Sequence, residues 1–180
     1  DNAYYIDRDW EGNHSSAGSI FEDFRGKINE TENTLLYGHN MGNGSMFHSV
    51  KSFKEEEWGR QAIYFEVATL EKRYLYRIVA SSVLNGEDGA ALILERITLN
   101  QEEFQKYIEE IRSTALVWYA PDDDPPTYGD KMIALQTCNS GAETAFAAFC
   151  SDSVWVSINR IASTNINKKG ILWKQDALCF

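Results

Sequence analysis

Two residues of this chain have the types and the positions needed for nucleophilic catalysis by a thiol. Cys138 ends the apolar run "KMIALQTC" and stands at its mouth, whereas a buried structural cysteine would normally lie inside such a run. His39 ends a second apolar run, "TLLYGH". A free thiol has a pKa of about 8.5 and is only slightly ionised at neutral pH, so a nucleophilic cysteine needs a histidine or another cation beside it. If both runs are strands, their ends can bring this pair together.

The other histidines and cysteines have simpler explanations. His14 lies in the polar stretch "EGNHSSAG" and is expected to be exposed, and His48 falls in a predicted helix, where packing or solvent contact is the ordinary role. An odd count of three cysteines, Cys138, Cys150 and Cys179, leaves at least one thiol unpaired. The chain has no C-x-x-C pair and no two histidines at metal-ligand spacing, so we expect neither a metal site nor a cofactor.

Composition and charge narrow the class of protein further. The chain has 180 residues, of which 43% are hydrophobic and 13% aromatic, which is typical of a folded protein with one substantial core. We therefore expect a single domain over residues 1–180. The formal net charge of −10 argues against a nucleic-acid partner, because nucleic-acid binding requires a basic face.

Short strands dominate the predicted secondary structure. Runs rich in β-branched and aromatic residues, bounded by polar turns, predict strands over 17–24, 33–41, 61–70, 73–84, 131–138, 144–150 and 154–161. The third and fourth of these flank the charged turn "EKR" and form a predicted hairpin. Many short strands interrupted by only two or three helices favour a mainly β fold, a small barrel, over a doubly wound parallel sheet.

Two segments have the spacing of amphipathic helices. Residues 100–114 form the stronger candidate, because Asn100 can cap the helix and Glu103 follows three residues later. Residues 44–59 form the second candidate. The apolar faces consist of Phe104, Tyr107, Ile108 and Ile111 in the former helix, and of Met46, Val50 and Phe53 in the latter.

The residues around His39 and Cys138 resemble a known family. "NTLLYGHNMGNGSMF", followed about a hundred residues later by "ALQTC", is similar to the class B sortases, which are cysteine transpeptidases. The opening stretch "DRDWEGNHSSAGSIFEDFRG" and the helix "FQKYIEEI" add to the resemblance. The similarity extends from about residue 4 to about residue 150, and the tail 151–180 is atypically long for the family.

The resemblance implies both a fold and a reaction. The fold would be a closed eight-stranded β-barrel with two or three peripheral helices, held by an N-terminal anchor at the extracellular face of a Gram-positive cell membrane. Cys138 would attack the threonine carbonyl of an Asn-Pro-x-Thr sorting signal in a secreted surface protein and form a thioacyl intermediate. An amine of peptidoglycan or of pilin would then resolve it. His39 would be the general acid and base.

The expected arginine of the family is missing from its usual place. Sortases carry an arginine at the start of the strand after the cysteine, where it stabilises the oxyanion or positions the substrate, and this chain has Ala145 there. Arg160 is the sole arginine after Cys138 and a weak substitute. A second departure is Ala134, where the family usually has threonine. The alternative is therefore a sortase-like protein that binds sorting signals and is catalytically impaired.

Other classes of protein fit the sequence less well. The distance from His39 to Cys138 is about a hundred residues, roughly twice the caspase interval, and no Arg or Gly follows the cysteine. Papain-like peptidases place the cysteine before the histidine, which is the opposite order. An ordinary binding domain leaves the pairing of His39 with Cys138 unexplained.

Overall fold

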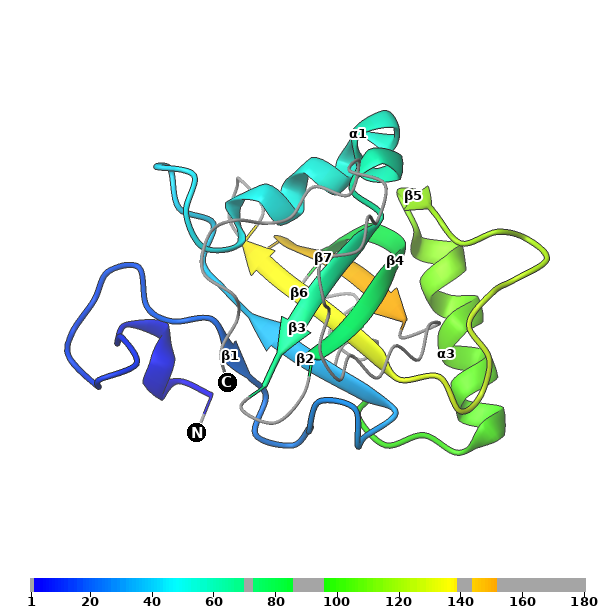
Figure 1. Cartoon of the computed structure of the whole chain (residues 1–180), viewed down its shortest axis with the longest axis horizontal. Helices are drawn as coiled ribbons and strands as arrows, with labels where there is room; N and C mark the ends of the chain where they lie inside the picture. The colour runs from blue at the N-terminus through cyan, green and yellow to red at the C-terminus, as the bar shows by residue number, and fades with distance from the viewer. Residues whose placement is uncertain (1, 70–72, 86–95, 139–143, 152–180) are drawn as a thin grey trace, which may run out of the picture.

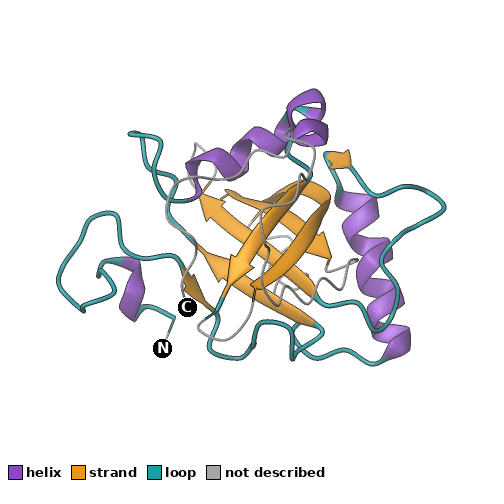
Figure 2. Ribbon diagram, in the orientation of Figure 1, coloured by secondary structure: helices purple, strands orange, loops and turns teal. Residues whose placement is uncertain are grey.

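The computed structural model describes residues 2–69, 73–85, 96–138 and 144–151. Seven strands form one sheet, and short helices lie around it (Figure 1, Figure 2). The strands are β1 (Phe21–Glu22), β2 (Asn33–Tyr37), β3 (Tyr64–Ala68), β4 (Arg73–Asn85), β5 (Val117–Trp118), β6 (Met132–Cys138) and β7 (Thr144–Ser151). The helices are η1 (Tyr4–Ile6) and η2 (Phe47–Lys54), both of the 3₁₀ type, and the α-helices α1 (Glu56–Gln61) and α3 (Gln101–Thr114).

The strand order of the sheet is β1-β2-β6-β7-β4-β3, with β5 paired to β4. β2 and β6 are parallel, and the other described pairs are antiparallel. The mainly β prediction is confirmed. Within the described strands no hydrogen-bonded pair joins β1 to β3, so closure into an eight-stranded barrel remains a prediction. The strand predicted over 154–161 lies outside the described residues.

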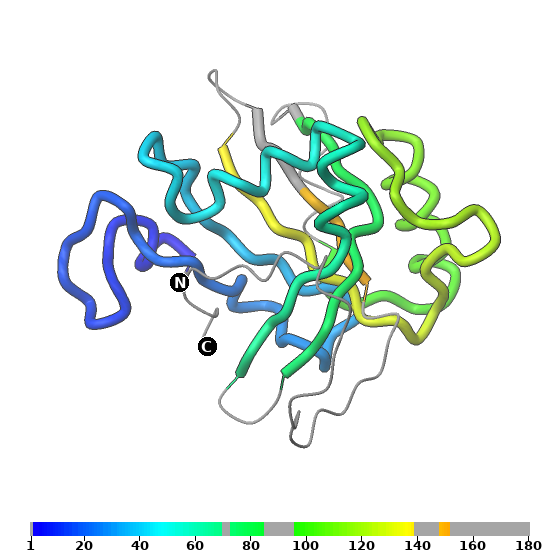
Figure 3. Tube along the Cα trace, turned by 45° about the horizontal axis from the view of Figure 1, so that its top comes forward, coloured from blue at the N-terminus to red at the C-terminus, as the bar shows by residue number. Residues whose placement is uncertain are grey.

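Two apolar clusters cover the two faces of the sheet. α3 buries Phe104, Tyr107, Ile108 and Ile111 against one face, and both halves of the predicted capping box are present between Asn100 and Glu103. η2 buries Phe47, Val50 and Phe53 in the other cluster. In the views of Figure 1 and Figure 3, η2 and α1 lie along the top of the sheet and α3 lies at its right-hand side. None of the described helices is long and apolar enough to cross a membrane.

The amphipathic helix predicted over 44–59 is confirmed in its burial of Val50 and Phe53, but it is divided into two shorter helices. The structure has the 3₁₀ helix η2 and then the short α1, separated by Glu55 in an extended conformation. The buried residues Phe47, Val50 and Phe53 are spaced by three, and this period aligns side chains on a 3₁₀ helix, which has three residues per turn. Met46, predicted to belong to the buried stripe, precedes the helix at a positive φ of 56°.

The strand predictions differ from the structure mainly at their ends. The strand predicted over 17–24 is reduced to β1, and the one predicted over 33–41 ends at Tyr37. The hairpin is confirmed, because β3 and β4 pair antiparallel from Tyr64 opposite Arg77 to Ala68 opposite Arg73. The two-residue β5 had no sequence signal of its own.

Candidate active site

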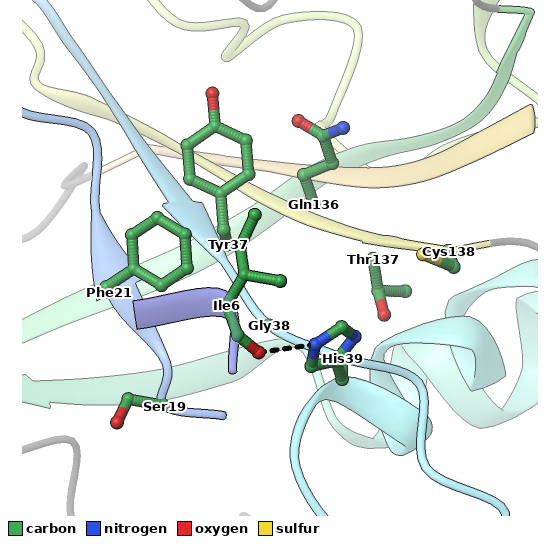
Figure 4. A pocket seen from close by; sticks show the side chains of 9 residues that line it. All are labelled: Ile6, Ser19, Phe21, Tyr37, Gly38, His39, Gln136, Thr137 and Cys138. Carbon is green, nitrogen blue, oxygen red and sulfur yellow. Dashed lines mark hydrogen bonds between the residues drawn. The ribbon is translucent and has the colours of Figure 1, made fainter. Parts of the chain in front are cut away.

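The sheet brings His39 and Cys138 to the same edge. In the parallel pair of β2 and β6, Tyr37 lies opposite Gln136, and the Gly38 amide donates to the Gln136 carbonyl at 3.1 Å. His39 and Cys138 each follow this last pair by two residues, and parallel strands leave a sheet at the same edge. Both residues line one pocket (Figure 4). Cys138 is the final residue of β6, and its thiol is free and exposed.

The pocket has an apolar side and a polar side. Its lining consists of Ile6, Ser19, Phe21, Tyr37, Gly38, His39, Gln136, Thr137 and Cys138. Figure 4 shows Phe21, Tyr37 and Ile6 at one end, with Thr137, Cys138 and His39 at the other. The rings of Phe21 and Tyr37 stack at a centroid distance of 5.2 Å. An apolar wall beside a thiol and an imidazole suits a peptide that buries a side chain while its carbonyl meets the thiol.

The His39 side chain is held by the backbone of the N-terminal segment. Its Nε2 lies 2.8 Å from the carbonyl oxygen of Ile6. A carbonyl only accepts hydrogen bonds, so Nε2 carries the proton of this contact. The His39 carbonyl in turn accepts from the Phe47 amide at 2.9 Å, which ties the residue to η2. The histidine is therefore fixed from both its side chain and its backbone.

Asn40 and His48 form a second polar contact at the site. The Asn40 side-chain amide donates to the Cys138 carbonyl at 3.2 Å, and its oxygen accepts from His48 Nδ1 at 3.0 Å. Asn40 was not predicted as a site residue from the sequence, and for His48 packing or solvent contact was the expected role. The available signal was the dipeptide "HN" directly after an apolar run. These contacts join the loop after β2 to the backbone of the candidate nucleophile.

A buried carboxylate supports the apolar wall. The Asp23 side chain is fully buried and accepts from Arg25 Nε and Nη2 at 2.9 and 2.8 Å, from the Tyr37 hydroxyl at 3.0 Å and from Asn2 Nδ2 at 2.9 Å. The hydrogen bond from the Arg25 side chain is the main cause that lowers the pKa of Asp23 to about 2, against the opposing effect of burial. Tyr37 is thus fixed at its hydroxyl end.

Ala145 lies directly across from Cys138 in the register of β6 and β7. None of the described residues that line the pocket is an arginine. Arg160 lies outside the described residues, and Ala134 is fully buried in β6 as part of the core. The role assigned to position 145 stays a prediction.

Comparison with known proteins identifies relatives of one kind. No family model matches the chain. It is 40% identical over 142 residues to sortase B of Listeria monocytogenes serovar 1/2a, covering 78% of this chain and 55% of the relative. It is 25% identical over 135 residues to sortase B of Staphylococcus aureus, covering 74% of this chain and 53% of the relative. The chain thus spans about half the length of these curated relatives.

Solved structures agree on the fold. Sortase B of Clostridium perfringens matches with a TM-score of 0.76 and 26% identity, covering 84% of this chain and 81% of that one. A complex of Staphylococcus aureus sortase B with substrate matches with a TM-score of 0.73 and 23% identity, covering 83% and 68%. A sortase B structure complexed with triglycine also matches, with a TM-score of 0.71, 22% identity and coverage of 82% and 68%.

Proposed function

Because this chain is related to the class B sortases in both sequence and fold, we propose that it is a cysteine transpeptidase acting through Cys138 and His39. The observation that carries the proposal is the parallel pairing of β2 with β6, which brings the two residues to one pocket. Nucleophilic catalysis by a thiol requires an imidazole within its reach, and a thiol and an imidazole that line one pocket support this assignment.

The reaction has two halves. The Cys138 thiolate attacks a peptide carbonyl carbon, the C–N bond after that carbonyl breaks, and the leaving amine takes a proton from the His39 imidazolium. The acyl group remains on Sγ as a thioester. An incoming amine then attacks the thioester and gives a proton to His39, an amide bond forms, and the thiolate leaves. The proton taken from His39 in the first half is thus returned in the second.

The substrates follow from the same relationship. We propose a sorting signal of the Pro-x-Thr type as the acyl donor, with cleavage after the threonine, and an amine of peptidoglycan or pilin as the acceptor. The apolar wall of Phe21 and Tyr37 supports a donor with an apolar side chain. Related structures of sortase B with substrate and with triglycine support a peptide and an amine as partners in general.

The proposal extends to the cellular location of the enzyme. The relationship to sortase B supports action at the cell surface. An anchor before residue 1, closure of the sheet into an eight-stranded barrel, and a single catalytic domain over residues 1–180 belong to the proposal as well.

The test is a library of peptides with Pro-x-Thr signals, followed by mass spectrometry of the intact protein. We expect a thioacyl adduct on Cys138 that disappears when a triglycine amine is added, with a ligated peptide as the product. Cys138→Ala is the control and should form no adduct. A protein that binds these peptides tightly yet never forms an adduct would contradict the proposal and support the binding-only alternative.

A further inference from the structure

The N-terminal loop, which we define as residues 5–19, folds back so that its two ends are hydrogen-bonded to each other, and its Ile6 carbonyl contacts His39. The Ser15 amide donates to the Asp7 carbonyl at 2.8 Å, and Arg8 forms an antiparallel bridge with His14. At the end of the loop, the Ser19 amide donates to the Tyr5 carbonyl at 3.0 Å, and the Ser19 hydroxyl donates to the Arg8 carbonyl at 2.8 Å. The loop is therefore closed by hydrogen bonds on both sides of Ile6.

Apolar burial does not account for this conformation. η1 has no buried residue, and Tyr4, Tyr5 and Ile6 are 45%, 40% and 47% exposed. The Ile6 carbonyl, however, points to His39 Nε2, 33 residues away in the chain (Figure 4). Besides the packing of Tyr5 on Phe21 at a centroid distance of 6.2 Å, this segment thus makes a hydrogen bond to the candidate acid and base.

Gly18 is the residue that permits the contact. It has a φ of 59°, and a Cβ built there would overlap with the Ile6 carbonyl oxygen and lie 2.8 Å from the Tyr5 carbonyl oxygen. Both atoms belong to backbone, so a side chain at position 18 would push the Ile6 carbonyl away. Only glycine combines this backbone conformation with such a close approach.

We infer that Gly18 is a positioning residue, which acts through the Ile6 carbonyl to select the Nε2–H tautomer of His39 and leave Nδ1 as the proton acceptor. The inference rests on the proposed function for its catalytic consequence, but not for its geometry. A neutral imidazole has one donor and one acceptor nitrogen, so a fixed acceptor at Nε2–H determines which nitrogen can exchange protons with the thiol or the substrate. Without the carbonyl both tautomers become accessible, and a fraction of the enzyme presents the wrong nitrogen.

The first test reads the tautomer without any activity. Long-range ¹H–¹⁵N correlation spectra of the full ¹⁵N-labelled chain distinguish the two tautomers of neutral His39. The spectra are recorded on the Cys138→Ala variant, so that ionisation of the thiol does not affect the His39 signals. We expect the Nε2–H form alone. Adding Gly18→Ala should produce a mixture of both forms. A dominant Nδ1–H form in the parent, or an unchanged spectrum after Gly18→Ala, would overturn the inference.

The second test measures, with Cys138 restored, how fast triglycine removes the thioacyl adduct, the step in which neutral His39 accepts a proton. Gly18→Ala should slow this step by the factor by which the Nε2–H population falls in the spectra, about twofold for an equal mixture of the tautomers. The matched control is Gly129→Ala, because Gly129 also has a positive φ, 112°, but a Cβ there meets no atom within 4 Å and the residue is absent from the pocket lining. Equal slowing by the two variants would assign the effect to backbone strain and contradict positioning.

These two measurements separate failure of the inference from failure of the proposed function. If no peptide ever forms an adduct but the tautomer shifts in Gly18→Ala, the transpeptidase proposal fails and the structural selection of the tautomer stands. If triglycine removes the adduct equally fast in the parent and in Gly18→Ala although the tautomer shifts, the function stands and the positioning role is wrong.

Discussion

The two segments that meet at the pocket are held in place by different forces. β2 and β6 are anchored by buried side chains, with Leu35 and Leu36 at 1% and 0% exposure and Ile133 at 0%, and by a continuous ladder of hydrogen bonds. The N-terminal loop has partly exposed apolar side chains and is held by backbone hydrogen bonds and by the packing of Tyr5 on Phe21 at a centroid distance of 6.2 Å. Cys138, the candidate nucleophile, is therefore positioned by a strand of the hydrophobic core, β6. The orientation of the His39 ring, the candidate base, depends on a hydrogen bond to the N-terminal loop. Substitutions in the strands should therefore change the stability of the fold, whereas substitutions in the N-terminal loop should change the reaction rate.

The largest expected effect is the loss of the thiol. Cys138→Ala should abolish the thioacyl adduct and leave the fold intact, because the side chain is exposed at the end of β6 and contributes little to the core. Mass spectrometry measures the adduct, and thermal unfolding measures stability. A marked loss of stability in Cys138→Ala would show that the end of β6 is part of the core. The effect of the substitution on reactivity could then not be separated from its effect on stability.

The next effect concerns the histidine between the two segments. His39→Ala should lower the rate of adduct formation by roughly 10²–10⁴-fold, the usual worth of a positioned acid and base, with little change in stability. His48→Ala is the matched comparison, since the His48 side chain forms a hydrogen bond with Asn40 and does not line the pocket, and its effect should stay below about tenfold. If His48→Ala were inactive while His39→Ala retained the parental rate, the assignment of the base would be wrong.

How much of this site could be predicted depended on which force builds each part. The apolar runs that end at His39 and Cys138 can be recognised from residue types alone, so the sequence predicts that this pair lies together. The same is true of the hairpin of β3 with β4 and of the cap of α3. The Ile6 carbonyl has no such signal, because any residue offers a backbone oxygen and the partner lies 33 positions away. Asn40 was missed for a related reason, since a side-chain contact to a distant backbone carbonyl follows from the fold.

A third prediction concerns the strand beside the nucleophile. Ala145 faces Cys138 in the register of β6 and β7, so Ala145→Arg would add guanidinium donors near the developing oxyanion. We expect adduct formation to rise by roughly 10²–10³-fold, the typical worth of such a donor. Thr144→Arg is the control, because adjacent positions of a strand fall on opposite faces. A folded Ala145→Arg variant with the parental rate would refute a need for arginine at this position.

The alternative for position 145 is a tightly packed strand that excludes a charge. An arginine buried there without a partner would destabilise the fold by several kcal/mol. Thermal unfolding of the same variant detects this outcome directly. The stability of Ala145→Arg therefore decides whether position 145 belongs to the packed core or to the wall of the site.

The smallest expected effect tests the junction between the two segments, at Asp23. This carboxylate binds Asn2 of the N-terminal segment as well as Tyr37 at the end of β2. Its pKa is lowered from 3.8 to about 2, chiefly by the Arg25 side chain, so the ionised form stabilises the folded state. The stabilisation, about 2 kcal/mol at most, is present above the unfolded pKa of about 4 and is lost as the pH falls toward 2.

Urea unfolding of the parent and of Asp23→Asn between pH 6 and pH 2 measures this difference. The gap in unfolding free energy should be constant above about pH 5 and should shrink steadily below pH 4, since the parent becomes protonated and resembles the amide. Asp9→Asn is a suitable control, because the hydrogen bonds that the Asp9 carboxylate accepts from described residues come from Glu11 and Asn13 of the same exposed loop. A gap that does not change with pH would mean that Asp23 acts through packing alone, and the junction would then belong to the core.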